Sequence, residues 1–380
     1  MRAAHPLSPH AFSRLRRLTA LTAVITLTLT MVSCSIGESN GDPVISSLTA
    51  QKADATVPRN SKSDMDNEPL SSAVGTVSMI TSDENRKKGA ISGDLTTTVV
   101  SRERSTDKFQ WAVSIKPAVA NQERTEYADN AQSAMSENMD LSSTGSAVVS
   151  PDGRYLSLIL LPAEQQSGET AADLRTHIVV LDTTTGKTVR NATVSGVILG
   201  HALTNSTLAV ETAQNYFPAG SGKGTITTFS LTDTSAQPSS FPTDKWLVGA
   251  TRENLMLAPE PFSDNCSYGR SMMTVTLINA DGSTAGSISG VTAVHPGGWI
   301  HRVADPKSDE QQLVNPSIKK TIDITGKNTF ERGVPTGPGL LVKQEVPTGN
   351  GSRERKPAFW LSSSDDGHPH TENLEQFTDD

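Results

Sequence analysis

Residues 147–194 read AVVSPDGRYLSLILLPAEQQSGETAADLRTHIVVLDTTTGKTVRNATV, and this stretch decides the fold. It holds four short runs that are rich in aliphatic and β-branched residues, which favour strands. The turn at Ser150–Gly153 separates the first two runs, and the turn at Asp182–Lys187 separates the last two. Their Pro-Asp-Gly and Thr-Gly-Lys sequences supply the backbone angles that hairpin turns need. The stretch therefore predicts four antiparallel strands in one meander.

The same pair of turns recurs along the chain. First-hairpin turns can be placed at Ser150, Leu203, Thr251, His295 and Thr336, and second-hairpin turns near Asp182, Thr232, Asn279, Asp323 and Ser364. Both series advance by roughly 40–55 residues, and a four-stranded repeat of about this length is the signature of a β-propeller blade. Strands at 96–100 and 109–115 add one more unit. We therefore predict an all-β propeller of five to seven blades, most simply six, over residues 73–361, and pairing of a strand from each end is one way to close it.

Two phrases of the sequence resemble bacterial β-propellers of the WD-repeat-like and quinoprotein-like type. One runs from Ser150 to Leu156 and opens a strand, and the other runs from Val180 to Lys187 and joins an outer strand pair. The resemblance covers roughly residues 141–361 and implies four-stranded blades. A pair of β-sandwich domains is the alternative fold. A polar insertion at 121–140 fits either a short helix or a long loop.

The N-terminal segment resembles the signal peptide of a bacterial lipoprotein. Arginines at 14, 16 and 17 precede an uncharged run from Leu18 to Val32, which ends at Ser33-Cys34. A cysteine at this place resembles a lipobox, which implies removal of a signal peptide at 1–33, acylation of Cys34 with palmitate-type chains and attachment to the outside of a bacterial cell membrane. The run from Leu18 to Val32 is shorter than the about 20 apolar residues that a transmembrane helix needs. An uncleaved anchor and simple secretion are the alternatives to lipidation.

Composition separates two polar segments, one on either side of the predicted propeller. Residues 34–72 are polar and rich in Gly, Pro and Asn, which predicts a lipid-anchored, disordered tether, and residues 362–380 read as an acidic, flexible tail. Charged residues make up 19% of the chain and aromatic residues 4%, which is typical of an exported β-rich protein. The net charge of −8 argues against nucleic acid as a partner.

Motifs for chemistry are weak. The loop Ala219–Thr225 is not a phosphate loop, because Phe217 stands where that pattern needs glycine and Gly224 where it needs Ser or Thr. His295 and His301 could share one side of a hairpin, but no cysteine or carboxylate cluster accompanies them, so we expect no metal site. Acylation of Cys34 would leave Cys266 without a disulfide partner, and we interpret Cys266 as a small buried hydrophobe.

Function has to be inferred from these features together. We expect no catalytic, cofactor-binding or metal-binding residue, and Cys34 is the one modification site that we predict. The favoured hypothesis is a lipid-anchored surface protein whose propeller is a non-catalytic binding or scaffolding module for a protein or glycan. The alternative is an extracytoplasmic propeller enzyme, a hydrolase, lyase or quinone-dependent dehydrogenase that acts on sugars or cell-wall material. Propeller active sites draw single residues from several blades, so linear spacing cannot separate the two, whereas the residues that line the central channel can.

Overall fold

The structure is a computed structural model of the chain. It describes residues 42–57, 69–83, 95–116, 146–165, 174–214, 224–262, 272–305, 307, 310–348, 352–363 and 365–377. The chain divides into two compact units, residues 1–39 and 40–380, and all of the described residues belong to the second. Cys34, Cys266 and the insertion at 121–140 therefore lie outside the described residues. In the described part, no helix has the length and apolarity needed to cross a membrane.

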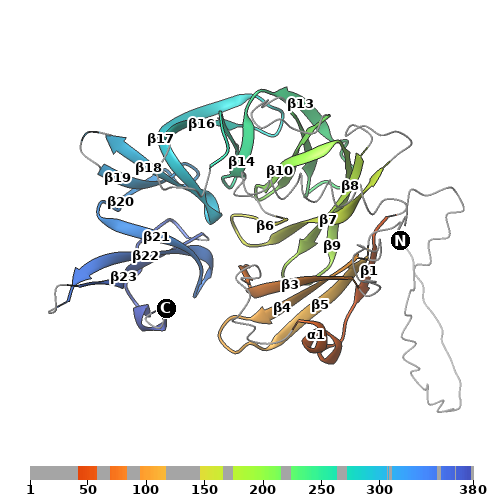
Figure 1. Cartoon of the computed structure of the whole chain (residues 1–380), viewed down its shortest axis with the longest axis horizontal. Coiled ribbons are helices and arrows are strands. Elements are labelled where there is room, and N and C mark those ends of the chain that lie inside the picture. The colour runs from red at the N-terminus through yellow and green to blue at the C-terminus, as the bar shows by residue number, and fades with distance from the viewer. Residues whose placement is uncertain are drawn as a thin grey trace, which may run out of the picture. The chain divides into compact units, whose positions relative to one another are not determined.

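The described elements are almost all antiparallel strands (Figure 1). The first sheet contains β1 (Val44–Ser47), β2 (Leu70–Ser71), β3 (Gly75–Asp83), β4 (Leu95–Glu103) and β5 (Phe109–Lys116). The second contains β6 (Ala147–Val149), β7 (Tyr155–Gln165), β8 (Leu174–Asp182) and β9 (Thr188–Ser195). The third contains β10 (Val197–Leu203), β11 (Thr207–Ala213), β12 (Gly224–Ser230) and β13 (Ser239–Thr243).

The remaining strands follow in the same pattern. The fourth sheet contains β14 (Trp246–Ala250), β15 (Leu255–Ala258), β16 (Met273–Ile278), β17 (Thr284–His295), β18 (Trp299–Asp305), β19 (Glu310–Asn315) and β20 (Lys320–Asp323). The fifth contains β21 (Lys327–Val334), β22 (Gly337–Pro347) and β23 (Arg353–Ser362). Short helices complete the fold: α1 (Ala50–Thr56), η4 (Pro296–Gly298) and η5 (Leu374–Phe377).

The seven-stranded sheet is two blades joined by one long strand. β17 pairs with β16 from Thr284 to Val291, and from Val291 onward the strand pairs with β18. Gly290 has φ +73° at the change of partner, and a Cβ atom there would lie 2.3 Å from the carbonyl oxygen of Val303. Gly196, with φ +100°, stands at the corresponding step from β9 to β10. Only glycine suits such steps, where one blade passes into the next.

The described strands thus form six blades in chain order. Blade 1 is β2–β5 with β1 added outside β5, blade 2 is β6–β9, and blade 3 is β10–β13. Blade 4 is β14–β16 with the first half of β17, and blade 5 is the rest of β17 with β18–β20. Blade 6 is β21–β23, and a bridge between Trp360 and His370 supplies its fourth, outermost position. The strand order and register confirm the predicted propeller of four-stranded blades.

Aliphatic contacts between neighbouring blades form the core. Blades 1 and 2 share one buried cluster that includes Val99 and Leu158, and blades 2 and 3 share another that includes Val180 and Leu208. Blade 4 packs on blade 3 through Leu247 and its neighbours. Blades 5 and 6 share a cluster that includes Trp299. Each sheet has two apolar faces that adjacent blades cover, as repeat stacking requires.

Most of the predicted hairpin turns are found where the sequence places them. All five first-hairpin turns lie between the inner two strands of a blade, and the turns near Asp182, Thr232 and Asn279 lie between the outer two, whereas Ser364 lies outside the described residues. Asp323 is the exception. Its turn leads from β20 to β21, hence from one blade to the next, and the outer hairpin of blade 5 turns at 316–319 instead. The prediction for this turn is wrong because an Asp-Ile-Thr-Gly sequence suits either kind of turn.

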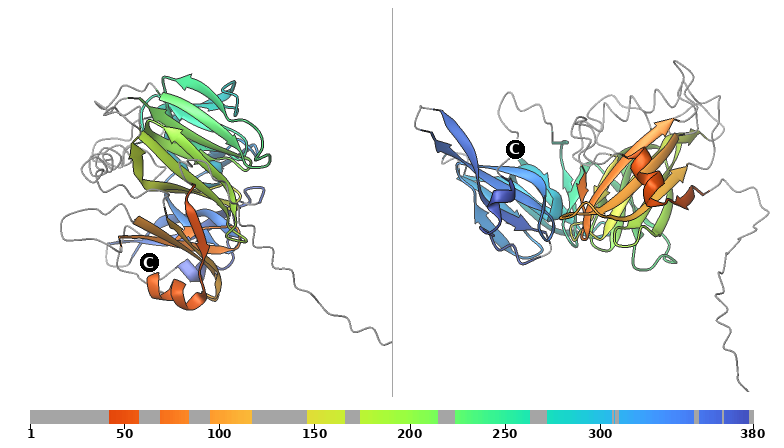
Figure 2. Two further views of the ribbon diagram at one scale, coloured as in Figure 1. Left: turned by 90° about the vertical axis from the view of Figure 1, so that its right-hand side faces the viewer. Right: turned by 90° about the horizontal axis from the view of Figure 1, so that it is seen from below.

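Part of the segment predicted as a tether is folded. Within residues 34–72, β1 pairs with β5, and α1 lies against β4 and β5 (Figures 1 and 2). Thr49 accepts a hydrogen bond from the Lys52 amide and begins the helix, and Ala53 is fully buried against blade 1. Arg102 Nη2 on β4 donates to Asp54 Oδ1 on α1 at 2.8 Å, which links the helix to the sheet. The described residues 42–57 are therefore part of the blade, and the prediction of disorder is corrected for them.

The C-terminal tail is also corrected for its described residues. His370 exchanges two backbone hydrogen bonds with Trp360, and Phe377 is buried beside Val334 and Leu341 of blade 6. The small number of aliphatics in this segment suggested a flexible tail. Phe377 and His370 hold it on blade 6, together with Leu374 and a hydrogen bond from Trp360 Nε1 to Glu372 O.

Blades 1 and 6 meet without sharing a strand. In the described residues, no C-terminal strand enters the sheet of blade 1, so the predicted option of closure by strand exchange is not used. β2 contacts β21 and β22, and Arg104 donates hydrogen bonds to Val334 O and to Ser71 Oγ. Ser71 Oγ in turn donates to Gly337 O at 3.0 Å. We call this join the seam.

Candidate functional site

The inner strands of the blades carry few charged residues. The strands β6, β10 and β14 and the second half of β17 read AVV, VILGHAL, WLVGA and VTAVH, without Asp, Glu, Lys or Arg. Charged residues on an inner strand of the described blades occur in β21, at Lys327, Glu331 and Arg332. The convergent carboxylates or arginines that a channel-centred enzyme would need are therefore not supplied by these four strands.

The histidines near the inner strands have structural partners. His201 is fully buried, and its Nδ1 lies 3.0 Å from Ser157 Oγ of blade 2. The rings of His295 and His301 are stacked with centroids 6.2 Å apart, which confirms that the two share one side of a hairpin. His301 Nε2 lies 3.1 Å from Gln311 Oε1 on β19. No group of three potential ligands suited to a metal ion occurs among the described residues.

A polar cluster holds the C-terminal segment on blade 6. His370 Nε2 lies 2.6 Å from Asp365 Oδ2, and His370 Nδ1 lies 2.7 Å from Glu372 Oε1. The imidazole also stacks on Trp360 with ring centroids 3.9 Å apart. Burial alone would lower the pKa of His370, but the hydrogen bonds to the two carboxylates raise it above its ordinary value. This cluster is a clamp on the chain end, since both imidazole nitrogens already have partners.

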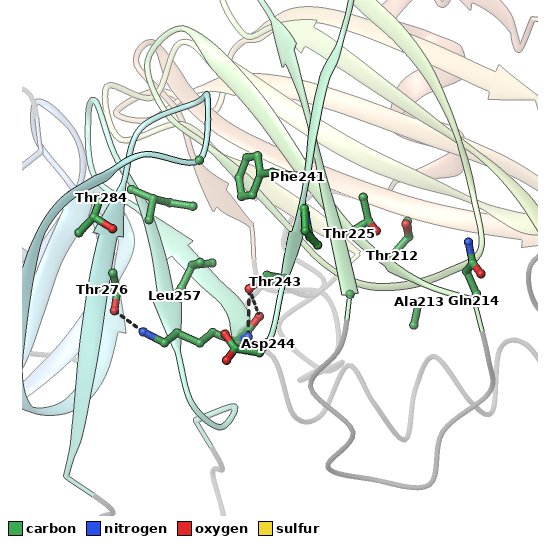
Figure 3. A pocket seen from close by; sticks show the side chains of 15 residues that line it. Thr212, Ala213, Gln214, Thr225, Phe241, Thr243, Asp244, Leu257, Thr276 and Thr284 are labelled. Carbon is green, nitrogen blue, oxygen red and sulfur yellow. Dashed lines mark hydrogen bonds between the residues drawn. The ribbon is translucent and has the colours of Figure 1, made fainter.

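A cavity of about 810 Å³ lies between the outer halves of blades 3 and 4, and we call it the rim cavity (Figure 3). Its lining residues come from β11–β13, from β15–β17 and from the turns beside them: Thr212, Ala213, Gln214, Gly224, Thr225, Phe241, Pro242, Thr243, Asp244, Lys245, Leu257, Thr276, Ile278, Gly282 and Thr284. The volume falls within the range of small-molecule sites. Figure 3 shows Thr276, Thr284 and Leu257 on the blade 4 side and Phe241 between the two blades.

Strand register explains which side chains face the rim cavity. Thr243 is the cross-strand partner of Gly224, and Phe241 is two residues earlier on the same face of β13. On the opposite wall, Thr276 is the cross-strand partner of Leu257. Small or polar residues, such as Gly224, Thr243 and Thr276, thus occupy the facing positions of blades 3 and 4. Large apolar side chains do not fill the space between the outer strands there, and the cavity results.

Hydrogen bonds between the blades fix the walls. Thr228 Oγ1 donates to Ala280 O at 2.9 Å, and Lys245 Nζ donates to Thr276 Oγ1 at 2.7 Å. Thr243 Oγ1 donates to Lys245 O and accepts from Lys245 N, which sets the turn that carries the lysine. The ammonium group is therefore held at the cavity wall by a short, closed turn.

Glu211 lies behind the wall of the rim cavity. It is fully buried on β11, and its Oε2 accepts a hydrogen bond from Leu247 N of blade 4 at 2.7 Å. Its Oε1 has no hydrogen-bond partner among the described residues, and a Cβ atom on Gly224 would stand 2.7 Å from it. Burial raises the pKa of Glu211 to about 7, although the hydrogen bond from Leu247 opposes that shift.

The chemistry available at the rim cavity suits binding. Its described lining residues offer threonine hydroxyls, the Lys245 ammonium, the Asp244 carboxylate and the ring of Phe241, and they include no serine, cysteine or histidine that could act as a nucleophile with a base. Glu211 is covered by Gly224 and engaged with Leu247. Sequence reasoning missed this site. A glutamate within the buried run TLAVETA of β11 was the one signal that could have indicated it.

Comparisons with known proteins show similarity of fold at low identity. No protein-family model and no curated protein matches the chain. The β-propeller domain of the trilobed protease from Pyrococcus furiosus is 12% identical, with 78% of this chain and 82% of that chain covered and a TM-score of 0.39. TolB from Acinetobacter baumannii is 12% identical over 73% of this chain, with a TM-score of 0.32. Hydrazine synthase from Kuenenia stuttgartiensis is 15% identical over 59% of this chain, with a TM-score of 0.28.

The chain spans less than two thirds of two of these structures, 64% of the hydrazine synthase chain and 60% of the TolB chain. All three TM-scores are below 0.5. The assignment of the fold therefore rests on the strand order and register of this chain, which make it a β-propeller of four-stranded blades.

Proposed function

We propose that the propeller is a non-catalytic binding module that holds a protein or glycan at the outer surface of a bacterial membrane. The observation that carries this proposal is the rim cavity, which has the volume of a ligand site and polar groups on both walls, and whose described lining residues include no serine, cysteine or histidine. The uncharged inner strands of blades 2 to 5 support the same conclusion, because a channel-centred enzyme needs convergent charged groups.

Capture from cell-envelope extracts tests the binding role. The full chain and a Thr284→Arg variant, in which a long cation fills the cavity from the blade 4 wall, are used as baits side by side. We expect a partner that the parent retains and the variant loses. Retention by both baits, or by neither, would contradict a role for the rim cavity. The matched control is Thr188→Arg, at an exposed position on β9 far from the cavity lining.

The membrane location is a second part of the proposal, and it rests on the sequence around Cys34. Metabolic labelling with a palmitate analogue tests it. Labelling of the parent and its loss in Cys34→Ala would support acylation at this residue. Equal labelling of both proteins would refute it, and would leave the binding role of the propeller to be judged on its own.

One observation bears on the enzyme alternative: Glu211 Oε1 is buried behind the cavity wall without a hydrogen-bond partner among the described residues, and burial raises the pKa of this carboxyl group to about 7, in the range of a general acid or base. If the propeller hydrolysed or cleaved a sugar polymer at the rim cavity, Glu211→Gln would abolish turnover on a panel of cell-wall polysaccharides. Turnover that is absent from the parent, or equal in parent and variant, would exclude this use of Glu211.

A further inference from the structure

The rim cavity presents hydrogen-bonding groups of both kinds. Among the described residues, the Thr284 hydroxyl has no hydrogen-bond partner, and the Thr276 hydroxyl only accepts, from Lys245 Nζ. Each of these hydroxyls can therefore donate to a ligand and accept from one. Lys245 Nζ has one protein acceptor, and two of its N–H groups are still available. The cavity thus suits a ligand whose groups are themselves donors and acceptors.

The charges on the lining are balanced. Lys245 and Asp244 are neighbours on the same turn, and both line the cavity. No described residue forms an ion pair with the Lys245 ammonium or the Asp244 carboxylate. An anionic ligand would meet the Asp244 carboxylate, and a cationic ligand would meet the ammonium. A neutral ligand with hydroxyl groups gains from both, because a hydroxyl can accept from the ammonium and donate to the carboxylate.

Apolar surface occurs beside these polar groups. Phe241 is half-buried on β13, and Leu257 and Ile278 line the opposite wall. A Cβ atom on Gly282 would lie 2.8 Å from the Phe241 ring, so glycine lets the turn before β17 pack directly on that ring and fixes its orientation. A fixed ring next to hydroxyls and charged groups matches a ligand that has an apolar C–H face and a polar edge.

An extended peptide fits the cavity less well. A peptide that adds to a sheet edge needs alternating N–H and C=O groups along that edge. The edge strand at the cavity is β13, and Pro242 occupies it and has no N–H to donate. The ladder of main-chain hydrogen bonds would be interrupted beside the cavity, so the side chains of the walls have to provide the affinity.

We propose that the rim cavity binds an uncharged sugar unit of a glycan, with Lys245 and Asp244 on its hydroxyl edge, Thr276 and Thr284 on the blade 4 side, and Phe241 against its C–H face. The inference rests on the proposed binding function and specifies its ligand class. The site lies between the outer strands of two blades, so a sugar unit within a longer chain could occupy it while the rest of the glycan extends away from the propeller.

An oligosaccharide array tests the ligand class directly. The purified full chain is applied to an array of neutral, uronate-bearing and amino-sugar oligosaccharides together with a library of extended peptides, and the strongest binder is then titrated by calorimetry. We expect neutral oligosaccharides to be retained. Thr284→Val and Lys245→Met should each weaken their binding by about tenfold, the factor that one lost hydrogen bond of about 1.4 kcal/mol produces.

The remaining variants separate binding from folding. Asp244→Asn changes an exposed side chain, so it leaves the packing intact and should also weaken binding. Lys187→Met and Thr188→Val change the same residue types on blade 2, away from the cavity, and should leave the affinity unchanged. If affinity for neutral sugars does not fall in any cavity variant, the inference is refuted.

The outcomes also distinguish the inference from the proposed function. Cavity-dependent binding of only acidic sugars, only amino sugars or only peptides would overturn the neutral-sugar assignment and leave the binding module in place. If nothing on the array or in the envelope extracts binds in a way that depends on the cavity, both the inference and the proposed function fail.

Discussion

Glu211 lies at the join between blades 3 and 4, and we expect this carboxyl group to make the join sensitive to pH. Glu211 is buried among aliphatic residues, and its protein hydrogen bond comes from Leu247 N. Titratable groups on the adjoining elements include His201 on β10, whose ring bonds Ser157 on the blade 2 side, and Lys245 at the cavity wall. Burial is the main cause of the raised pKa of Glu211, and the Leu247 amide is the opposing one.

Glu211 should make the protein less stable as pH rises through its titration range. The pKa is raised from 4.5 to about 7 on folding, so the folded state binds the proton more tightly than the unfolded chain. The stabilisation is complete below pH 4.5 and is lost as pH rises to 7, by about 3 kcal/mol. Glu211→Gln should remove this slope, which urea unfolding at a series of pH values measures.

The control for this experiment is Glu354→Gln, because Glu354 is exposed on β23 and its ion-pair partner among the described residues is the exposed Lys356. It should keep the slope of the parent. A slope that persists in Glu211→Gln would mean that another group, such as His370, is responsible for the pH dependence in this range.

At the scale of elements, both terminal segments complete a blade that faces the seam. The helix α1 covers Val100 and Ala112 on the face of blade 1 that blade 2 does not touch. The segment that ends in η5 covers Val334, Leu341 and Trp360 on the face of blade 6 that blade 5 does not touch. In a propeller whose first and last blades share no strand, these faces need other cover, and the chain ends supply it.

The C-terminal clamp should hold only within a window of pH. Hydrogen bonds to two carboxylates raise the pKa of His370 against the effect of burial, so its stabilisation is present below its ordinary value of 6.5 and is lost as pH rises through the raised pKa. A backbone hydrogen bond and His370 lower the pKa of Glu372 below 4.5, so its contribution is lost as pH falls through that lower value. Hydrogen exchange of residues 370–377, compared with the intrinsic rate at each pH, should be slow between these limits and faster on either side of them.

The variant His370→Gln tests the clamp, because glutamine keeps hydrogen-bonding capacity but has no charge to lose. Exchange of the C-terminal segment in this variant should be faster than in the parent at pH 5 and should not change further as pH rises. His368→Gln serves as the control, since the His368 ring is exposed and lies edge-on to His370 without a hydrogen bond between them. If both variants keep the profile of the parent, His370 is not the group that titrates.

The sequence predicted the elements of the propeller far better than its site. Turn residues such as Ser150 and Thr251 begin inner hairpins, where their hydroxyls bond backbone amides, and this local chemistry can be read directly from the chain. The turn at Asp323 shows the limit of this local chemistry. A turn sequence does not indicate whether the next strand belongs to the same blade or to the following one. For the rim cavity, the sequence offered only the sign of a glutamate within the buried run of β11. Glu211, Phe241 and Thr284 come from three strands, and only the stacking of two blades brings their strands together.

At the scale of the whole propeller, the seam is the join that depends most on polar contacts. Neighbouring blades elsewhere share clusters of buried aliphatic residues, but the described clusters contain none that spans blades 1 and 6. Arg104 instead donates to Val334 O across the join, and to Ser71 Oγ, Ser72 O and Gly75 O within blade 1. One guanidinium group therefore connects the first blade to the last.

Replacing Arg104 with methionine should loosen the seam without unfolding the blades. The variant leaves Val334 O without its donor, and the loss of a hydrogen bond from a charged group costs about 2 kcal/mol. Amides of β2 and β21 should then exchange faster, while those of blades 2 to 4 keep their protection, because aliphatic clusters hold them. Arg154→Met is the matched control, since Arg154 is exposed and its ion pair with Asp182 lies within blade 2. Equal exchange of β2 and β21 in the parent and in Arg104→Met would show that the contacts of β2 with β21 and β22 close the propeller without the arginine.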